Sequence, residues 1–334
     1  MMRPWVAAVG LLAIAALAMV VAGANPLLGF FALFQGSLGG PSQIAETLVQ
    51  TSSLLFPSLA VAFAFRAGLF NIGAEGQLIV GGLVAGVLGV HLIAPQIIAV
   101  PILLAGGALG GAIWGSLAGI LRARFGGNEV IATLMLNIIA ALMANYLVVG
   151  PLHTPGAAGP ETGELPVTSW LPTLLPGSRL TIALIIAILL AFLVRWVFDR
   201  TVFGYELRAS GDAPDAARRA GINLPRMAFL AMSISGAMAG LGGATIVTGV
   251  LHRFNVSLSP GYGFIAIAVA LVGDLDPLLI VVASFAFGML QSGSLTMQAV
   301  AHVPKDVVSF VEGLAIVALA ARRFVGTRKT AAGA

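Results

Sequence analysis

The sequence contains little charge and no cysteine. Of its 334 residues, 17 are basic and 13 are acidic, so charged residues make up 9% of the chain, whereas soluble globular domains carry ~25%. The absence of cysteine excludes disulfides and thiolate metal sites. The four histidines are scattered without the spacing of metal ligands, so we expect no metal site. This composition is not that of an ordinary soluble domain.

The chain also lacks the motifs of most enzymes. Its only two lysines are Lys305 and Lys329, and neither follows a glycine. A phosphate loop of the G-x-x-x-x-G-K-[ST] type is therefore absent, so this chain cannot build the usual nucleotide site. No Ser/His/Asp arrangement and no pair of carboxylates stands out. We expect neither enzymatic activity nor a cofactor in this chain.

Long apolar runs dominate what is present, since 59% of the residues are hydrophobic. A helix needs ~20 mostly apolar residues to cross a bilayer, and the apolar content suffices for about ten such helices. Continuous runs favour helices over a barrel, whose strands alternate apolar and polar residues. The 42 glycines suit close contact between helices in lipid. The sequence therefore predicts an all-α polytopic membrane protein with one transmembrane domain over residues 1–334.

The breaks between the apolar runs predict where the spans lie. The ten expected spans are 1–23, 51–65, two within 77–121 on either side of a turn at 91–95, 130–149, 180–194, 227–251, 261–273, 277–293 and 307–321. The first also resembles a signal peptide, which is the alternative for that segment. Over 25–50 we expect a glycine-rich loop with a short interfacial helix at 42–50.

Basic residues gather at one end of the predicted spans, which orients the chain by the positive-inside rule. Arg3, Arg122, the arginines of 195–226 and those after residue 321 share one side if ten spans alternate from a cytoplasmic N-terminus. Both termini are then cytoplasmic, and the acidic loop 150–178 is external. The basic excess is explained by this anchoring and not by nucleic-acid binding.

One polar segment, Asp199–Arg226, interrupts the apolar pattern; we call it the polar island. It holds nine of the chain's thirty charged residues (17 basic and 13 acidic). Pro214 can start a short helix over 214–220, which Asp212 would cap and Gly221 would end. A capped helix between two spans can serve as a docking site for a partner protein in the cytoplasm. A solvated loop is the alternative.

A second polar string, Phe65–Gln77 (FRAGLFNIGAEGQ), lies between two apolar spans. Its three glycines permit the chain to unwind, and unwound backbone at membrane depth is tolerated only where it is buried or lines a cavity. The string predicts either a broken helix beside a transport path or a plain cytoplasmic turn in which Arg66 and Glu75 are solvated.

A third string, Gly126–Asn137 (GGNEVIATLMLN), opens a predicted span. Asn128 can cap the helix, and Glu129 is favourable in its first turn. Asn137 lies two turns inside the apolar helix, where polar groups usually face the bundle interior or a cavity. It predicts either a hydrogen bond between helices or a contact with solute.

The three strings FRAGLFNIGAEGQ, NEVIATLMLN and ELRASGDAPDAARRAGI resemble the membrane permease subunits of bacterial ABC importers for nucleosides. This family belongs to the wider group of ribose and branched-chain amino acid permeases, and the resemblance covers about Phe30 to Leu319. It implies a ten-helix importer half that pairs with a second homologous permease. It also implies an ABC ATPase that docks on the polar island and hydrolyses ATP with Mg, and an external substrate-binding lipoprotein.

The resemblance carries two groups of functional residues onto this sequence. Coupling to the ATPase is expected from Gly204, Glu206, Arg208, Gly211, Asp212, Asp215, Ala217, Arg218 and Gly221. The solute path is expected from Asn71, Glu75, Gln77 and Asn137.

The predicted function is therefore import of nucleosides or related small polar solutes across the bacterial plasma (inner) membrane. A sugar-specific or amino-acid-specific permease of the same family is one alternative. A secondary transporter driven by protons is another, because Glu312 is a carboxylate inside the last predicted span.

Overall fold

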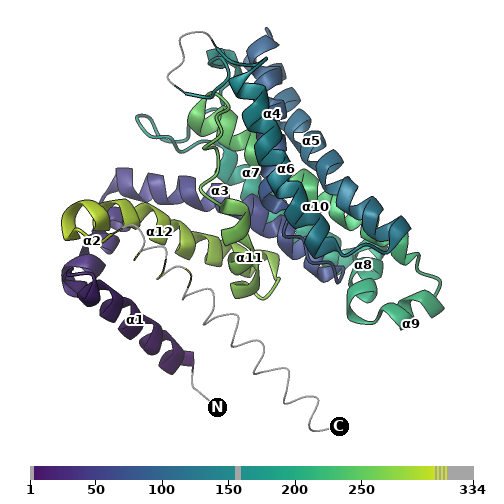
Figure 1. The fold of residues 1–334 in the computed structure, drawn as a ribbon, viewed down its shortest axis with the longest axis horizontal. Helices are drawn as coiled ribbons and strands as arrows, with labels where there is room; N and C mark the ends of the chain where they lie inside the picture. Colours follow the sequence, from purple (N-terminus) through teal and green to yellow (C-terminus); the bar gives the residue numbers. More distant parts are fainter. Residues whose placement is uncertain (1–3, 155–158, 305–306, 308–309, 311–312, 314–334) are drawn as a thin grey trace. The chain divides into compact units, whose positions relative to one another are not determined.

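The computed structural model describes residues 4–154, 159–304, 307, 310 and 313. The described chain is built of helices, and its only β pairings are two isolated bridges (Figure 1), which confirms the all-α prediction. It divides into two units, Met1–Thr51 with Phe285–Ala334, and Ser52–Ser284. The boundaries fall inside helices α3 (Pro41–Arg66) and α12 (Pro277–Ala301).

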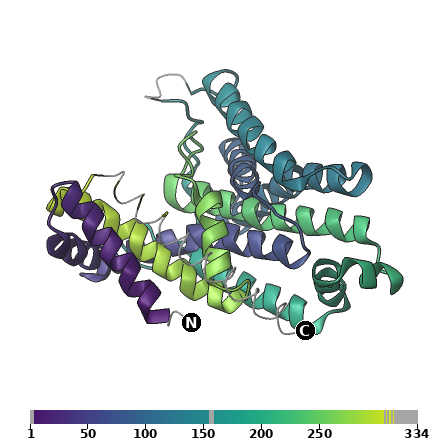
Figure 2. The ribbon, with the colours of Figure 1, turned by 60° about the horizontal axis from the view of Figure 1, so that its bottom comes forward.

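The larger unit, Ser52–Ser284, contains the predicted functional strings. Between α3 and α12 its helices are α4 (Ala74–His91), α5 (Gln96–Phe125), α6 (Glu129–Val149), η1 (Val167–Ser169), α7 (Ala183–Arg200), α8 (Val202–Asp212), α9 (Pro214–Arg219), α10 (Leu224–Ile246), the π-helical η2 (Val247–Leu251) and α11 (Tyr262–Val272). Figures 1 and 2 both place α8 and α9 at the end of this unit opposite the loop that follows α6.

Six helices of the described chain are long and apolar enough to cross a membrane: α3, α4, α5, α6, α10 extended by η2, and α12. A bent pair, formed by α1 (Pro4–Val21) and α2 (Pro26–Leu38), makes a seventh if counted as one span. Of the other predicted spans, α7 ends in a charged stretch, α11 has only 11 residues, and most of 307–321 lies outside the described residues. The count of ten stays a prediction.

Several predicted helix ends are confirmed. Residues 92–95 form the turn between α4 and α5. Asn128 caps α6, because its Oδ1 accepts a hydrogen bond from the Val130 amide at 2.9 Å. Gly221 follows α9 in the left-handed region with φ +87°, and the Ile222 amide donates to the Ala217 carbonyl at 3.0 Å, as in a glycine C-cap.

The expected loop at the start of 25–50 is wrong, whereas the expected helix at 42–50 is present as the first part of α3. Most of that segment is helical, in α2 and in the first half of α3. Asn25 starts α2 by accepting the Leu27 amide at 3.0 Å, and Pro26 occupies the first helical position, where no amide donor is needed. Gly39 and Gly40 break the helix for only two residues. Local capping therefore outweighed the glycine content that had suggested a loop.

Backbone contact between glycines fixes the centre of the larger unit, where α5 packs along α10. A Cβ added to Gly111 would lie 2.7 Å from the Gly240 Cα and closer still to the Gly236 carbonyl oxygen. A Cβ on Gly236 would in turn overlap the Gly111 carbonyl oxygen. No side chain fits between the two backbones, which is the contact predicted from the glycine content.

The described parts of the loop 150–178 fold back onto the segment after η2. Arg253 donates to Glu161 at 2.8 Å and lies 3.6 Å from Glu164. His252 stacks on Trp170, with ring centroids 3.8 Å apart. Arg253 thus pairs with both acidic residues of this loop, Glu161 and Glu164.

We expect Gly236→Ala to destabilise the protein, because the new methyl group must push α10 away from α5. Overpacking of this kind costs about 1–3 kcal/mol. The measurement is the apparent melting temperature in detergent. The matched control is Gly10→Ala, at a helical glycine whose added Cβ has no neighbour within 4 Å. Equal melting temperatures for both variants would contradict the packing argument.

We also expect stability to fall at acidic pH through His252. Burial lowers the pKa of His252 below its ordinary value of about 6.5. The unfolded chain therefore binds this proton more readily, so the free energy of unfolding decreases as the pH drops through that range. His252→Phe keeps a stacking ring without titrating. Its melting temperature should change less than that of the wild type between about pH 7.5 and pH 5.5.

Candidate functional site

The backbone leaves the helical pattern between α3 and α4. Residues 67–73 are irregular, and Gly68 has φ +74°, which is a conformation that favours glycine. The chain then runs into the bundle: Asn71 is 0% exposed, Gln77 1% and Glu75 7%. The interpretation as a plain turn with a solvated Glu75 is therefore wrong: the middle of the string, 67–73, is non-helical and leads into the buried start of α4.

Asn71 is the centre of a hydrogen-bond network that joins three helices. Its Nδ2 donates to Gln77 Oε1 at 3.0 Å and to the Ser235 hydroxyl at 2.7 Å, and its Oδ1 accepts the Gly73 amide at 2.9 Å. Ser235 on α10 donates in turn to the Ala60 carbonyl on α3 at 2.6 Å. One side-chain amide thus holds α3, α4 and α10 against the irregular segment.

Asn137 fixes the same segment from α6. Its Oδ1 accepts the Gly76 amide at 2.8 Å, and its Nδ2 donates to the Ile72 carbonyl at 2.9 Å. Of the two alternatives for Asn137, the hydrogen bond between helices is therefore present. The assignment to the solute path stays a prediction.

Glu75 connects the segment to α11. Its carboxylate accepts the Gly263 amide at 2.7 Å, in the first turn of α11, where a negative charge is favourable. Gly263 is required there, because an added Cβ would lie 2.5 Å from the Glu75 Cα. The Ser259 hydroxyl caps the same helix by accepting the Tyr262 amide at 2.8 Å.

The structure therefore brings all four predicted solute-path residues together around residues 71–77. Sequence reasoning missed Ser235, Ser259 and Gly263, which lie far along the chain from this string. The only available signal was a serine or a glycine within an apolar segment, and many such residues occur in this sequence.

The polar island forms two helices instead of the one predicted. The unpredicted helix is α8, which Thr201 caps by accepting the Gly204 amide at 3.0 Å. Asp212 does not cap α9. It is the last residue of α8, and Ala213 occupies the N-cap position of α9 without a side-chain hydrogen bond. The prediction failed because helical φ/ψ angles continue through Asp212, which leaves its carboxylate at a helix end.

The predicted coupling residues fall into two groups by exposure. Four are exposed at the end of α8 and around α9: Asp212, Asp215, Arg218 and Gly221. The others are buried or half-buried: Gly204, Glu206, Arg208, Gly211 and Ala217. Gly204 packs on α7, since an added Cβ would lie 2.8 Å from the Phe198 Cα. The exposed group can contact another protein, while Gly204 and Gly211 pack α8 against neighbouring backbone.

The island and the irregular segment touch, although about 140 residues separate them along the chain. A Cβ on Gly211 would lie 2.5 Å from the Arg66 carbonyl oxygen and 2.6 Å from the Gly68 nitrogen. A Cβ on Gly68 would lie 2.9 Å from the Gly211 Cα. The end of α8 thus rests, backbone on backbone, on the turn that leads to Asn71.

The family described as branched-chain amino acid transport system / permease component matches residues 43–320. The guanosine ABC transporter permease protein NupP of Bacillus subtilis is 37% identical over 96% of this chain and 94% of its own length. The nucleoside ABC transporter permease protein NupB of Lactococcus lactis is 33% identical over 93% and 87%.

A third relative is the glucose ABC transporter permease protein TsgB13 of Haloferax volcanii, which is 29% identical over 94% of this chain and 85% of its own length. No solved structure matches the chain. The similarity thus extends over nearly the full length of each of these relatives.

We expect Asn137→Leu to destabilise the protein, because it leaves the Gly76 amide and the Ile72 carbonyl unpaired in a dry interior. Each unsatisfied group costs about 1–3 kcal/mol. Asn145→Leu is the matched control, at an exposed position of the same helix. Thermal unfolding in detergent should show a clear loss for the first variant and little for the second. A similar loss in both variants would contradict the assignment of the cost to these two hydrogen bonds.

Proposed function

This chain belongs to the permease component family of branched-chain amino acid transport systems and is a permease subunit of an ABC importer, and we propose that its solute is a nucleoside. The similarity to the guanosine permease, at 37% identity over 96% of the chain, carries this proposal. A sugar is the second candidate, which the similarity to the glucose permease favours.

The polar groups around residues 71–77 suit a neutral nucleoside. The amides of Asn71, Gln77 and Asn137 each donate and accept hydrogen bonds, as do the edges of a base and the hydroxyls of ribose. In the described conformation these amides bond one another, Ser235 and the backbone. During transport they exchange these partners for the solute, and this exchange keeps binding weak enough for release.

The polar island supplies the coupling. The exposed residues of α9 dock a cytoplasmic ABC ATPase, which binds ATP and Mg, so this chain needs neither a cofactor nor a catalytic group. Movement of α9 passes through α8 to the contact between Gly211 and Gly68, and from there to Asn71 three residues further on. The support for this route is the close backbone approach at both glycines.

The complete importer contains further subunits. A second homologous permease pairs with this chain, and an external substrate-binding lipoprotein delivers the solute. The family consists of multi-pass membrane proteins. We assign this chain to the bacterial plasma membrane, with α9 on the cytoplasmic side. The competing proton-driven mechanism needs Glu312, which lies outside the described residues.

Uptake of radiolabelled guanosine should stop in cells that are depleted of ATP while the proton gradient is maintained. ATP hydrolysis in the partner, and not the gradient, drives transport in this proposal. The control is an uncoupler added to ATP-replete cells, which should leave initial uptake largely intact.

Two outcomes would contradict the proposal. Uptake that survives ATP depletion and ends with the uncoupler would favour proton coupling through Glu312. Uptake of guanosine that excess glucose inhibits as strongly as excess adenosine or uridine would favour a sugar as the solute.

A further inference from the structure

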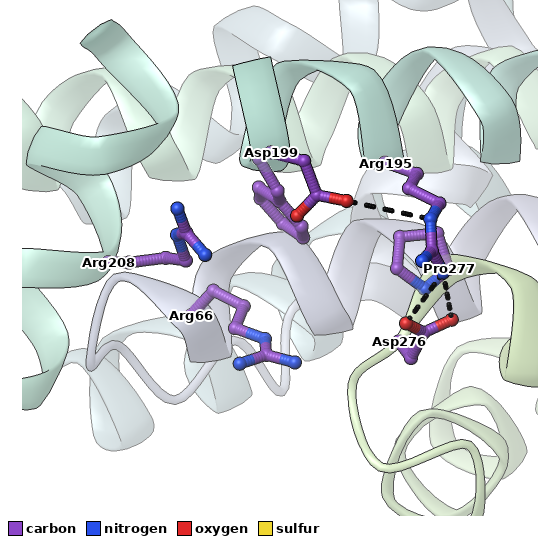
Figure 3. Close-up of a pocket in the computed structure, with 7 residues that line it drawn as sticks. Arg66, Arg195, Asp199, Arg208, Asp276 and Pro277 are labelled. Carbon is purple, nitrogen blue, oxygen red and sulfur yellow. Dashed lines mark hydrogen bonds and ion pairs between the residues drawn. The ribbon is translucent and has the colours of Figure 1, made fainter. Parts of the chain in front are cut away.

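A small cavity of about 40 Å³ lies beside α8, at the end of the larger unit that carries α9 (Figure 3). The ends of α3, α7 and α8 meet there with the loop before α12. The lining residues are Arg66, Arg195, Phe198, Asp199, Arg208, Asp276 and Pro277. Three guanidinium groups and two carboxylates thus surround a space that fits one small polar group.

Arg195 engages both carboxylates. Its Nη1 donates to Asp276 at 2.9 Å, and its Nε lies 3.5 Å from Asp199. Asp276 is used further, because it also accepts the Leu278 amide at 2.9 Å at the start of α12. Both carboxylates that line the cavity therefore already interact with Arg195.

The other two arginines have no carboxylate partner among the described residues. Arg66 donates only to backbone carbonyls, those of Leu275 at 3.3 Å and Asp274 at 3.4 Å. The Nε of Arg208 is buried and has no hydrogen-bond acceptor in the described part of the chain. In Figure 3 no interaction joins Arg66 or Arg208 to either aspartate. A guanidinium stays charged at all accessible pH values, so a buried N–H without an acceptor calls for an anion.

We propose that this cavity binds the carboxylate of an acidic side chain on the ATPase that docks at α9. The inference rests on the proposed function. The excess of cationic groups selects an anion, and guanidinium groups bind carboxylates with two parallel hydrogen bonds. Since α8 continues into the exposed α9 through the single residue Ala213, a protein held on α9 is close enough to reach Arg208. The side chains of Arg195 and Asp199, 42% and 48% exposed, leave the cavity open to solvent.

An anion in this position stabilises one particular arrangement of α8. It joins Arg208 on α8 to Arg66 at the end of α3, next to the contact between Gly211 and Gly68. Docking of the partner then stabilises the contact of α8 with the turn that leads to Asn71, and its departure leaves the Arg208 Nε without an acceptor. A carboxylate of the partner thus interacts electrostatically with residues directly beside this turn.

The test compares Arg208→Gln with Arg200→Gln, whose exposed arginine lies at the end of α7 outside the cavity. Each variant is purified with its partner permease in nanodiscs. The probe is the ATPase subunit that copurifies with the wild type, and its Kd is measured at low and high NaCl. We expect Arg208→Gln to weaken binding about tenfold or more at low salt and to flatten the salt dependence. Arg200→Gln should behave as the wild type, and Arg208→Lys should lie between them because it keeps only the charge.

Three results would overturn the inference. The first is a Kd for Arg208→Gln equal to that of the wild type, with the melting temperatures of both permease pairs showing that they are folded. The second is stabilisation of the permease pair alone by inorganic phosphate, lost in Arg208→Gln while ATPase affinity is unchanged, which assigns the cavity to a free anion. The third is a wild-type pair that binds no ATPase, which removes the proposed function as well. The first two results leave the proposed function intact.

Discussion

Seven residues between α3 and α4 are not helical. The amides of the first three still bond to carbonyls at the end of α3, but the buried part around Asn71 lies where water is not available to satisfy its backbone groups. The structure meets this constraint with side-chain amides: Asn71 accepts the Gly73 amide, and Asn137 pairs with Ile72 and Gly76. The residues assigned to the solute path thus also hold the irregular backbone in place. A permease that must open and close benefits from this double use, because exchange of a few hydrogen bonds releases the segment.

Glycine supplies the second recurring device. Along α5 and α10 it lets two backbones touch over several turns, which makes the centre of the larger unit rigid. The same close approach occurs between Gly68 and Gly211. It joins the turn between α3 and α4 to α8, which leads to the exposed helix α9. Rigid packing follows from the absence of a side chain, and in the coupling route proposed above the same close contact would pass a displacement of α8 on to the turn.

Apart from the buried Glu75, charge gathers towards the two ends of the larger unit, and several of these groups form ion pairs. Arg253 binds the acidic loop after α6, and Arg195 binds the aspartates beside α12. Exposed ion pairs of this kind add little stability, but they fix which segments lie together. Arg208, in the island, differs from these arginines, because its buried Nε has no acceptor among the described residues.

The sequence alone determined the features that depend on neighbours along the chain. Apolar runs gave most of the long helices, Asn128 and Gly221 gave helix ends, and the density of charge located the polar island. Local caps also start α2 at Asn25 and α8 at Thr201, and sequence reasoning missed both. Only the tertiary structure decided that Asp212 ends α8 instead of capping α9. It also decided the partners of Asn71, Glu75 and Asn137, and the contact between Gly68 and Gly211. These pairs join residues up to 188 positions apart, and close packing of whole helices, which no local pattern encodes, selects them.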